Sequence, residues 1–81
     1  MTPRMANLTA LLRRIKLRQQ LPPPRGRRRA RVAAGLSQRD VARAIEVAPA
    51  TIALWESGQR NPRPDLLVRY LRLLNAISKA S

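Results

Sequence analysis

The side chains able to do chemistry in this chain are mostly cationic. Its 81 residues contain 17 Lys and Arg but only 4 Asp and Glu, and they contain no His and no Cys. Without His and Cys there are no histidine general bases, cysteine nucleophiles, disulfides or thiolate metal sites. The net charge of +13 favours polyanionic partners. We therefore expect a protein that is not an enzyme, uses no metal or cofactor and binds nucleic acid, although composition alone fits a solvated basic tail equally well.

Two short helices joined by a tight turn are predicted between residues 35 and 62. Ser37 and Asp40 have the spacing of a capping box, so a helix should start at Ser37. Pro49 lacks an N–H, which is harmless only in a first helical turn, so a second helix should start there and end at Gly58. The connection is only about three residues long, as in a helix-turn-helix.

The segment GLSQRDVARAIEVAPATIALWESGQRNP (residues 35–62) resembles the lambda-repressor-like, Cro-type helix-turn-helix family. Its Gly-Leu-Ser-Gln, Thr-Ile-x-x-Trp-Glu-x-Gly and Asn-Pro elements match the family pattern, and the resemblance runs from about Arg27 to Ile77. It implies an all-α bundle of about four helices that places its second motif helix in the DNA major groove. Two positions depart from the pattern: Glu46 stands where Gly is usual, and Ala48 where Ser or Thr is usual.

The resemblance also assigns the residues that would meet DNA. The base-edge positions are Pro49, Ala50, Ala53 and Leu54. None has a side-chain hydrogen-bond donor. Contact with thymine methyl groups remains, with Thr51, Ser57 and Gln59 as polar contributors at the edges, so sequence discrimination should be modest. The residues expected to contact phosphate are Gln38, Arg39, Thr51, Ser57, Gln59, Arg60 and Asn61. The alternative is that this apolar helix face binds protein.

The first helix of the family usually gives the core two large apolar residues, where this chain has Arg27 and Ala30. We expect Leu21 or the N-terminal helix to fill the gap. By the same resemblance Arg31 pairs with Glu56 inside the domain, so removing either partner would strand the other charge.

Positive charge is concentrated ahead of the motif, since residues 1–35 hold ten of the basic residues and no acidic one. We expect a basic arm that follows the DNA backbone or enters a narrow A·T minor groove, with a solvated charged face as the alternative. The basic arm consists of Arg25, Arg27, Arg28 and Arg29.

An amphipathic basic helix is predicted from Asn7 to about Gln20, and Pro22 to Pro24 should form an extended connector after it. Its apolar face consists of Leu8, Leu11, Leu12 and Ile15. Packing on the domain or on a second copy is the first interpretation. DNA-backbone contact, membrane-surface binding and a transit peptide are the others, and the lack of Ser in residues 1–35 counts against the last.

A last helix should begin near Pro64. Its core stripe is Leu67, Tyr70, Leu71 and Leu74. A second, partly exposed stripe of Leu66, Leu73 and Ile77 predicts a dimer interface.

Two units are therefore expected: residues 1–24, a basic helix with its Pro linker, and residues 25–81, a DNA-binding domain. No apolar run approaches the roughly 18 residues of a membrane span, so we expect no membrane role and a cytoplasmic protein, nucleoid-associated when bound to DNA. The predicted function is sequence-preferring binding of double-stranded DNA by a homodimer, as a repressor-like regulator of phage, mobile-element or antitoxin type. The alternative is a protein-interaction module that binds a polymerase, toxin or other protein through this scaffold and the N-terminal helix.

Overall fold

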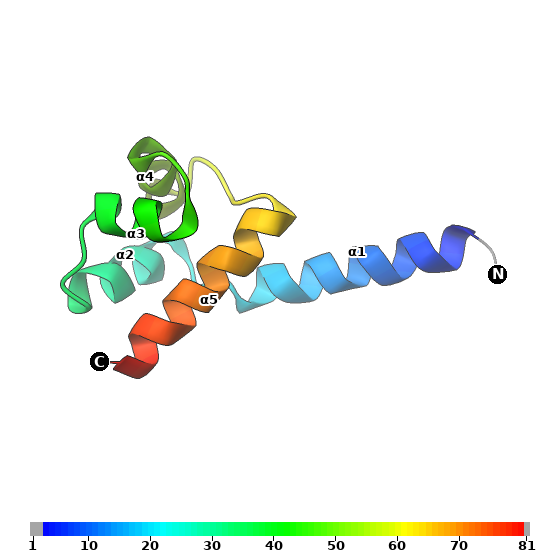
Figure 1. The fold of residues 1–81 in the computed structure, drawn as a ribbon. Coiled ribbons are helices and arrows are strands. Elements are labelled where there is room, and N and C mark those ends of the chain that lie inside the picture. The colour runs from blue at the N-terminus through cyan, green and yellow to red at the C-terminus, as the bar shows by residue number, and fades with distance from the viewer. Residues whose placement is uncertain (1–2, 81) are drawn as a thin grey trace.

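The computed structural model describes residues 3–80, which form five helices and no strand (Figure 1). The helices are α1 (Pro3–Gln20), α2 (Pro24–Ala33), α3 (Gln38–Ile45), α4 (Pro49–Ser57) and α5 (Pro64–Ala80). The predicted all-α class, with four domain helices and one additional N-terminal helix, is confirmed. Residues 1, 2 and 81, at the ends of the two predicted units, lie outside the described residues.

Helix α1 projects from the bundle formed by α2 to α5, and the whole measures 48 × 25 × 20 Å (Figure 1). It begins at Pro3, not at Asn7 as predicted, so Asn7 lies inside the helix and does not cap it. The chain reaches the domain at the end of α1: Leu17 in the helix and Leu21 just after it are half-buried, and Leu21 packs against the core. The expectation that Leu21 helps to complete the core is confirmed, whereas most of α1 does not pack on the domain.

The predicted extended connector is shorter than expected. Pro22 and Pro23 are non-helical, but Pro24 is the first residue of α2. A proline is readily accepted there because its missing N–H would have no intrahelical partner. The basic arm, expected to lead into the first domain helix, therefore lies within that helix.

The core lies where α2, α3, α4 and α5 meet. Trp55 and Tyr70 are in contact, with ring centroids 4.8 Å apart and planes inclined by 45°. Around them the main cluster of buried residues is completed by Val41, Ala42, Ile45, Ile52 and Leu74. The predicted core stripe of α5 is buried as expected.

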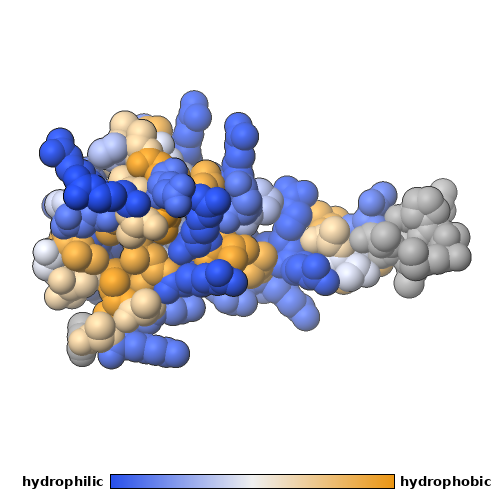
Figure 2. Space-filling model, in the orientation of Figure 1, coloured by the Kyte–Doolittle hydropathy of each residue, from blue (hydrophilic) through white to orange (hydrophobic). Residues whose placement is uncertain are grey.

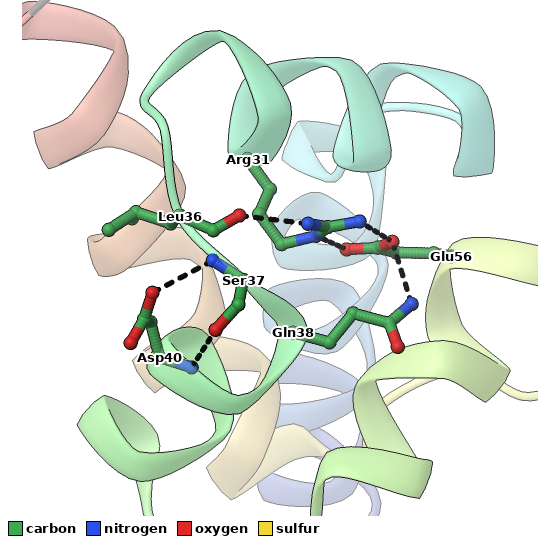
Figure 3. Close-up of polar contacts among 6 residues, drawn as sticks. All are labelled: Arg31, Leu36, Ser37, Gln38, Asp40 and Glu56. Atoms are coloured by element: carbon green, nitrogen blue, oxygen red, sulfur yellow. Dashed lines mark hydrogen bonds and ion pairs between the residues drawn. The ribbon is translucent and has the colours of Figure 1, made fainter.

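The two motif helices begin and end as their sequences predict. The Ser37–Asp40 capping box is present: the Ser37 N–H donates to Asp40 Oδ2 at 2.8 Å, and the Asp40 N–H donates to Ser37 Oγ at 3.0 Å (Figure 3). At the end of α3, Glu46 adopts φ 62° and ψ 51°, a left-handed conformation that favours Gly. Ala48 precedes α4 without a side-chain cap.

Helix α4 ends where α2 begins. Gly58 terminates α4 with φ 79°, and a Cβ added there would lie 3.0 Å from Cγ of Pro24. Glycine is therefore required both for the backbone conformation and for the close approach of the two helix ends.

Among residues 3–80, no helix is both long enough and apolar enough to cross a membrane.

Candidate nucleic-acid interface

An ion pair between α2 and α4 holds the motif in place, as predicted. Arg31 Nε lies 2.6 Å from Glu56 Oε2, and Arg31 Nη2 donates to Glu56 Oε1 at 3.0 Å (Figure 3). Arg31 Nη1 also donates to the Leu36 carbonyl at 2.8 Å, which ties the loop before α3 to the pair. The side chains are only 12% and 4% exposed, and the hydrogen bond to Glu56 raises the pKa of Arg31. Such a two-point contact fixes orientation as well as distance.

Gln38 joins this ion pair. Its Nε2 donates to Glu56 Oε1 at 3.2 Å, so one of its two amide hydrogens is used inside the domain (Figure 3). The other amide hydrogen of Gln38 is still available for the predicted donation to a DNA phosphate, while Glu56 holds the side chain in position. The N-terminus of α3 is thus positioned relative to α4 through a shared carboxylate.

Arg27 does not belong with the solvent-facing arginines of the basic arm. It is only 6% exposed, and its Nε donates to the Pro22 carbonyl at 2.7 Å. Its Nη1 donates to the Trp55 carbonyl at 2.8 Å and to Asn61 Oδ1 at 3.3 Å. Burial lowers the pKa of Arg27. The expectation that Arg27 follows the DNA backbone is therefore wrong: this side chain ties the connector and the α4–α5 loop to the last turn of α4.

The other three arginines of the basic arm are exposed on α2. At about 100° per residue they lie between about 100° and 160° around the helix from Arg27. Arg25 and Arg29 lie about 120° or more around the helix from both Arg27 and Arg31, which face α4, so they point away from it, and Arg28 is exposed about 60° from Arg31. The basic arm is thus divided into one buried arginine and an outward-facing ridge on a different side of the domain.

The outward face of α4 carries the predicted base-edge residues. Pro49 and Ala50 are exposed, while Ala53 and Leu54 are half-buried. Ser57, predicted to contact phosphate, instead directs its hydroxyl to the Leu54 carbonyl at 3.0 Å and accepts the Gln59 N–H at 3.3 Å. Its first role is therefore to stabilise the C-terminus of α4.

A hollow of about 130 Å³ lies beside this face. It brings together Thr51, Leu54, Arg60 and Asn61, four residues predicted to meet DNA. Arg63 also lines it, and sequence reasoning missed this residue because it lies beyond the motif. Arg39 is exposed at the start of α3. Arg39, Arg60 and Arg63 are thus exposed cations that could contact phosphates beside α4, in contrast to Arg27 and Arg31, which are hydrogen-bonded to α4 inside the domain.

Comparison with protein families identifies the domain. A model described as helix-turn-helix matches residues 28–80, which covers α3, α4, α5 and most of α2 but excludes α1. No curated protein and no solved structure matches the chain.

Proposed function

The chain belongs to the lambda-repressor-like helix-turn-helix family, and from that premise we propose that it binds duplex DNA through α3 and α4 and regulates transcription. The observation that carries the proposal is the Arg31–Glu56 pair, which fixes α4 against α2 while the outward face of α4 stays free. A helix held in this way can enter a major groove without rearranging the domain.

The composition of the outward face of α4 supports readout through shape and methyl groups. Ala50, Ala53 and Leu54 offer no donors to base edges, so contact with thymine methyl groups is the available direct readout. Phosphate contacts from Arg39, Arg60 and Arg63 would fix the position of the helix but would not specify sequence. We therefore propose modest sequence preference on a strong electrostatic background.

We also propose that two copies bind one operator. A hollow of about 350 Å³ is lined by Leu36 and Ile77 together with the small residues Ala33, Ala34 and Ala80. Val32, which precedes Ala33 in the chain, is 55% exposed. Apolar surface of this kind suits a second copy, and a two-fold dimer would place two α4 helices on half-sites one or more helical turns apart.

Binding by such a dimer would repress transcription by occluding a promoter, in the manner of a phage, mobile-element or antitoxin regulator. The protein would then act in the cytoplasm, on the nucleoid.

The test is fluorescence anisotropy with genomic and random duplexes over a range of salt concentrations. If each subunit neutralises about 6 phosphates, log K should fall against log salt with a slope near −5 for one bound subunit and about −11 for the dimer. Leu54→Gln introduces an amide that can hydrogen-bond base edges, so it should change the preferred base pairs and leave the slope unchanged. A flat salt profile, or an unchanged preference in Leu54→Gln, would count against DNA reading by α4.

A protein-interaction function is the second candidate, because α1 exposes large apolar side chains that DNA binding does not explain. A chain with this function alone would give neither a preferred duplex nor a defined footprint.

A further inference from the structure

Helix α1 carries an apolar stripe that nothing in residues 3–80 covers. Leu8 and Leu11 are each 50% exposed, Leu12 is 49% exposed and Ile15 is 44% exposed. Their spacing places all four on one face over about two helical turns. Figure 2 shows hydrophobic and hydrophilic patches side by side along this projecting helix. The stripe lies outside the part of the chain that matches the helix-turn-helix family.

The stripe is not a continuation of the face that docks on the domain. Helix α1 contacts α5, and the half-buried residues nearest the domain are Leu17 and Leu21. At about 100° per residue, Leu17 lies about 140° from Leu12 and about 160° from Ile15 around the helix. The stripe therefore points away from the domain, and its exposure follows from the way α1 is attached.

Cations border the stripe on both sides. One hollow, of about 180 Å³, is lined by Leu11, Arg14, Ile15 and Arg18. Another, of about 270 Å³, is lined by Thr9, Leu12, Arg13 and Lys16. Residues 1–35 contain no acidic residue, so no carboxylate of α1 itself neutralises these charges. A partner for this face must therefore supply both apolar surface and negative charge.

The need for both apolar surface and negative charge distinguishes between the possible partners of α1. A second copy of α1 would match the leucines but would set four cations against four cations, which disfavours pairing. DNA would neutralise the cations but give the leucines no apolar contact. A membrane surface would suit both in part, yet α1 has no Trp, Tyr or Phe with which to insert into the interface. We propose that α1 is a docking helix for an amphipathic helix of another protein whose apolar face is bordered by Asp or Glu.

The experiment uses the full chain and a labelled three-heptad peptide with Leu at positions a and d and Glu at positions e and g. We expect saturable binding that weakens with salt and leaves DNA affinity unchanged. The double variant Leu8→Gln and Leu12→Gln should weaken peptide binding by about tenfold or more, since burial of two leucines is lost. Ala10→Gln lies on α1 outside the stripe, is equally polar and should have no effect.

A charge-reversal variant tests the same proposal with the leucines intact. Arg14→Glu with Arg18→Glu should lose affinity for the Glu peptide and gain affinity for a matched peptide with Lys at positions e and g. The proposal is overturned if the native chain binds both peptides equally, or if a Glu peptide with its leucines scattered around the helix binds as well. It is also overturned if phosphatidylglycerol vesicles bind and the Glu peptide does not, or if the chain alone dimerises in a way that Leu8→Gln with Leu12→Gln abolishes.

Discussion

Replacing Arg27 by Ala should destabilise the domain although its acceptors within residues 3–80 are carbonyl and amide oxygens rather than carboxylates. The substitution removes hydrogen bonds to the Pro22 carbonyl, the Trp55 carbonyl and Asn61 Oδ1. Hydrogen bonds made by a charged donor contribute about 1.5–3 kcal/mol each, but loss of the buried charge also relieves its desolvation cost. Only the bond to Trp55 is fully buried. We therefore expect a net loss of about 3 kcal/mol, or about 12–24 °C in Tm for a domain of this size.

The measurement is urea and thermal unfolding followed by circular dichroism and by the fluorescence of Trp55, whose carbonyl accepts one of the bonds. Arg28→Ala is the matched control, because it removes the neighbouring, exposed arginine of the same helix and should change stability by less than about 0.5 kcal/mol. Arg27→Met restores apolar volume but leaves the carbonyls without a donor, so it should recover only part of the loss. If Arg27→Ala and Arg28→Ala were equally mild, the side chain would be solvated and the original assignment of Arg27 to the basic arm would stand.

Three further predictions, each with its own variants, test other parts of the fold. Arg31→Ala and Glu56→Ala should each cost about 3–5 kcal/mol, and the double variant should cost much less than the sum; simple additivity in urea unfolding would mean that the pair is not coupled. Glu46→Gly should raise stability by up to about 1 kcal/mol because residue 46 is left-handed, whereas Ala44→Gly within α3 should lower it by a similar amount; equal Tm shifts would contradict the reasoning. Tyr70 has a buried hydroxyl that finds no hydrogen-bond partner in the described part of the chain, and burial raises its pKa to about 12 from 10.0. The folded state thus holds the Tyr70 proton more tightly than the unfolded chain does. The contribution of this proton to the free energy of unfolding is complete below pH 10 and is lost as the pH rises from 10 to 12. The Tyr70→Phe variant should therefore lose less stability between pH 10 and 12 than the native chain does.

The motif could be predicted from sequence because its signals are local. The Ser37–Asp40 capping box, Pro49 and Gly58 each specify a helix end through interactions within a few residues. The Arg31–Glu56 pair spans 25 residues, and only the family resemblance could supply it.

The prediction for Arg27 was wrong because contacts between residues far apart in the sequence determine whether this side chain is buried. Arg27 lies in a run of arginines that reads as a charged tail, and nothing local distinguishes it from Arg28. What separates them is helical phase, because Arg27 shares the inward face of α2 with Arg31. The sequence does contain one indication that Arg27 is buried, because the family usually has a large apolar core residue at this position. An arginine there must either be exposed and leave a gap in the core, or be buried with hydrogen-bond acceptors for its guanidinium group. The predicted start of α1 at Asn7 is wrong for a different, local reason: Asn is a strong capping signal, yet the helix begins four residues earlier, at Pro3.

The way α1 joins the domain has a consequence for geometry along DNA. Arg27 holds the Pro22 carbonyl, the rings of Pro22 and Pro23 restrict the backbone, and Leu21 packs against the core. The junction is therefore more rigid than a flexible linker, and it restricts the direction in which α1 projects from the domain. A protein docked on α1 while α4 sits in the groove would be presented on one side of the duplex. The docked protein should then reach a second DNA site only when that site faces the same side of the duplex. Its binding there should rise and fall about every 10 base pairs as the distance between the two DNA sites is changed.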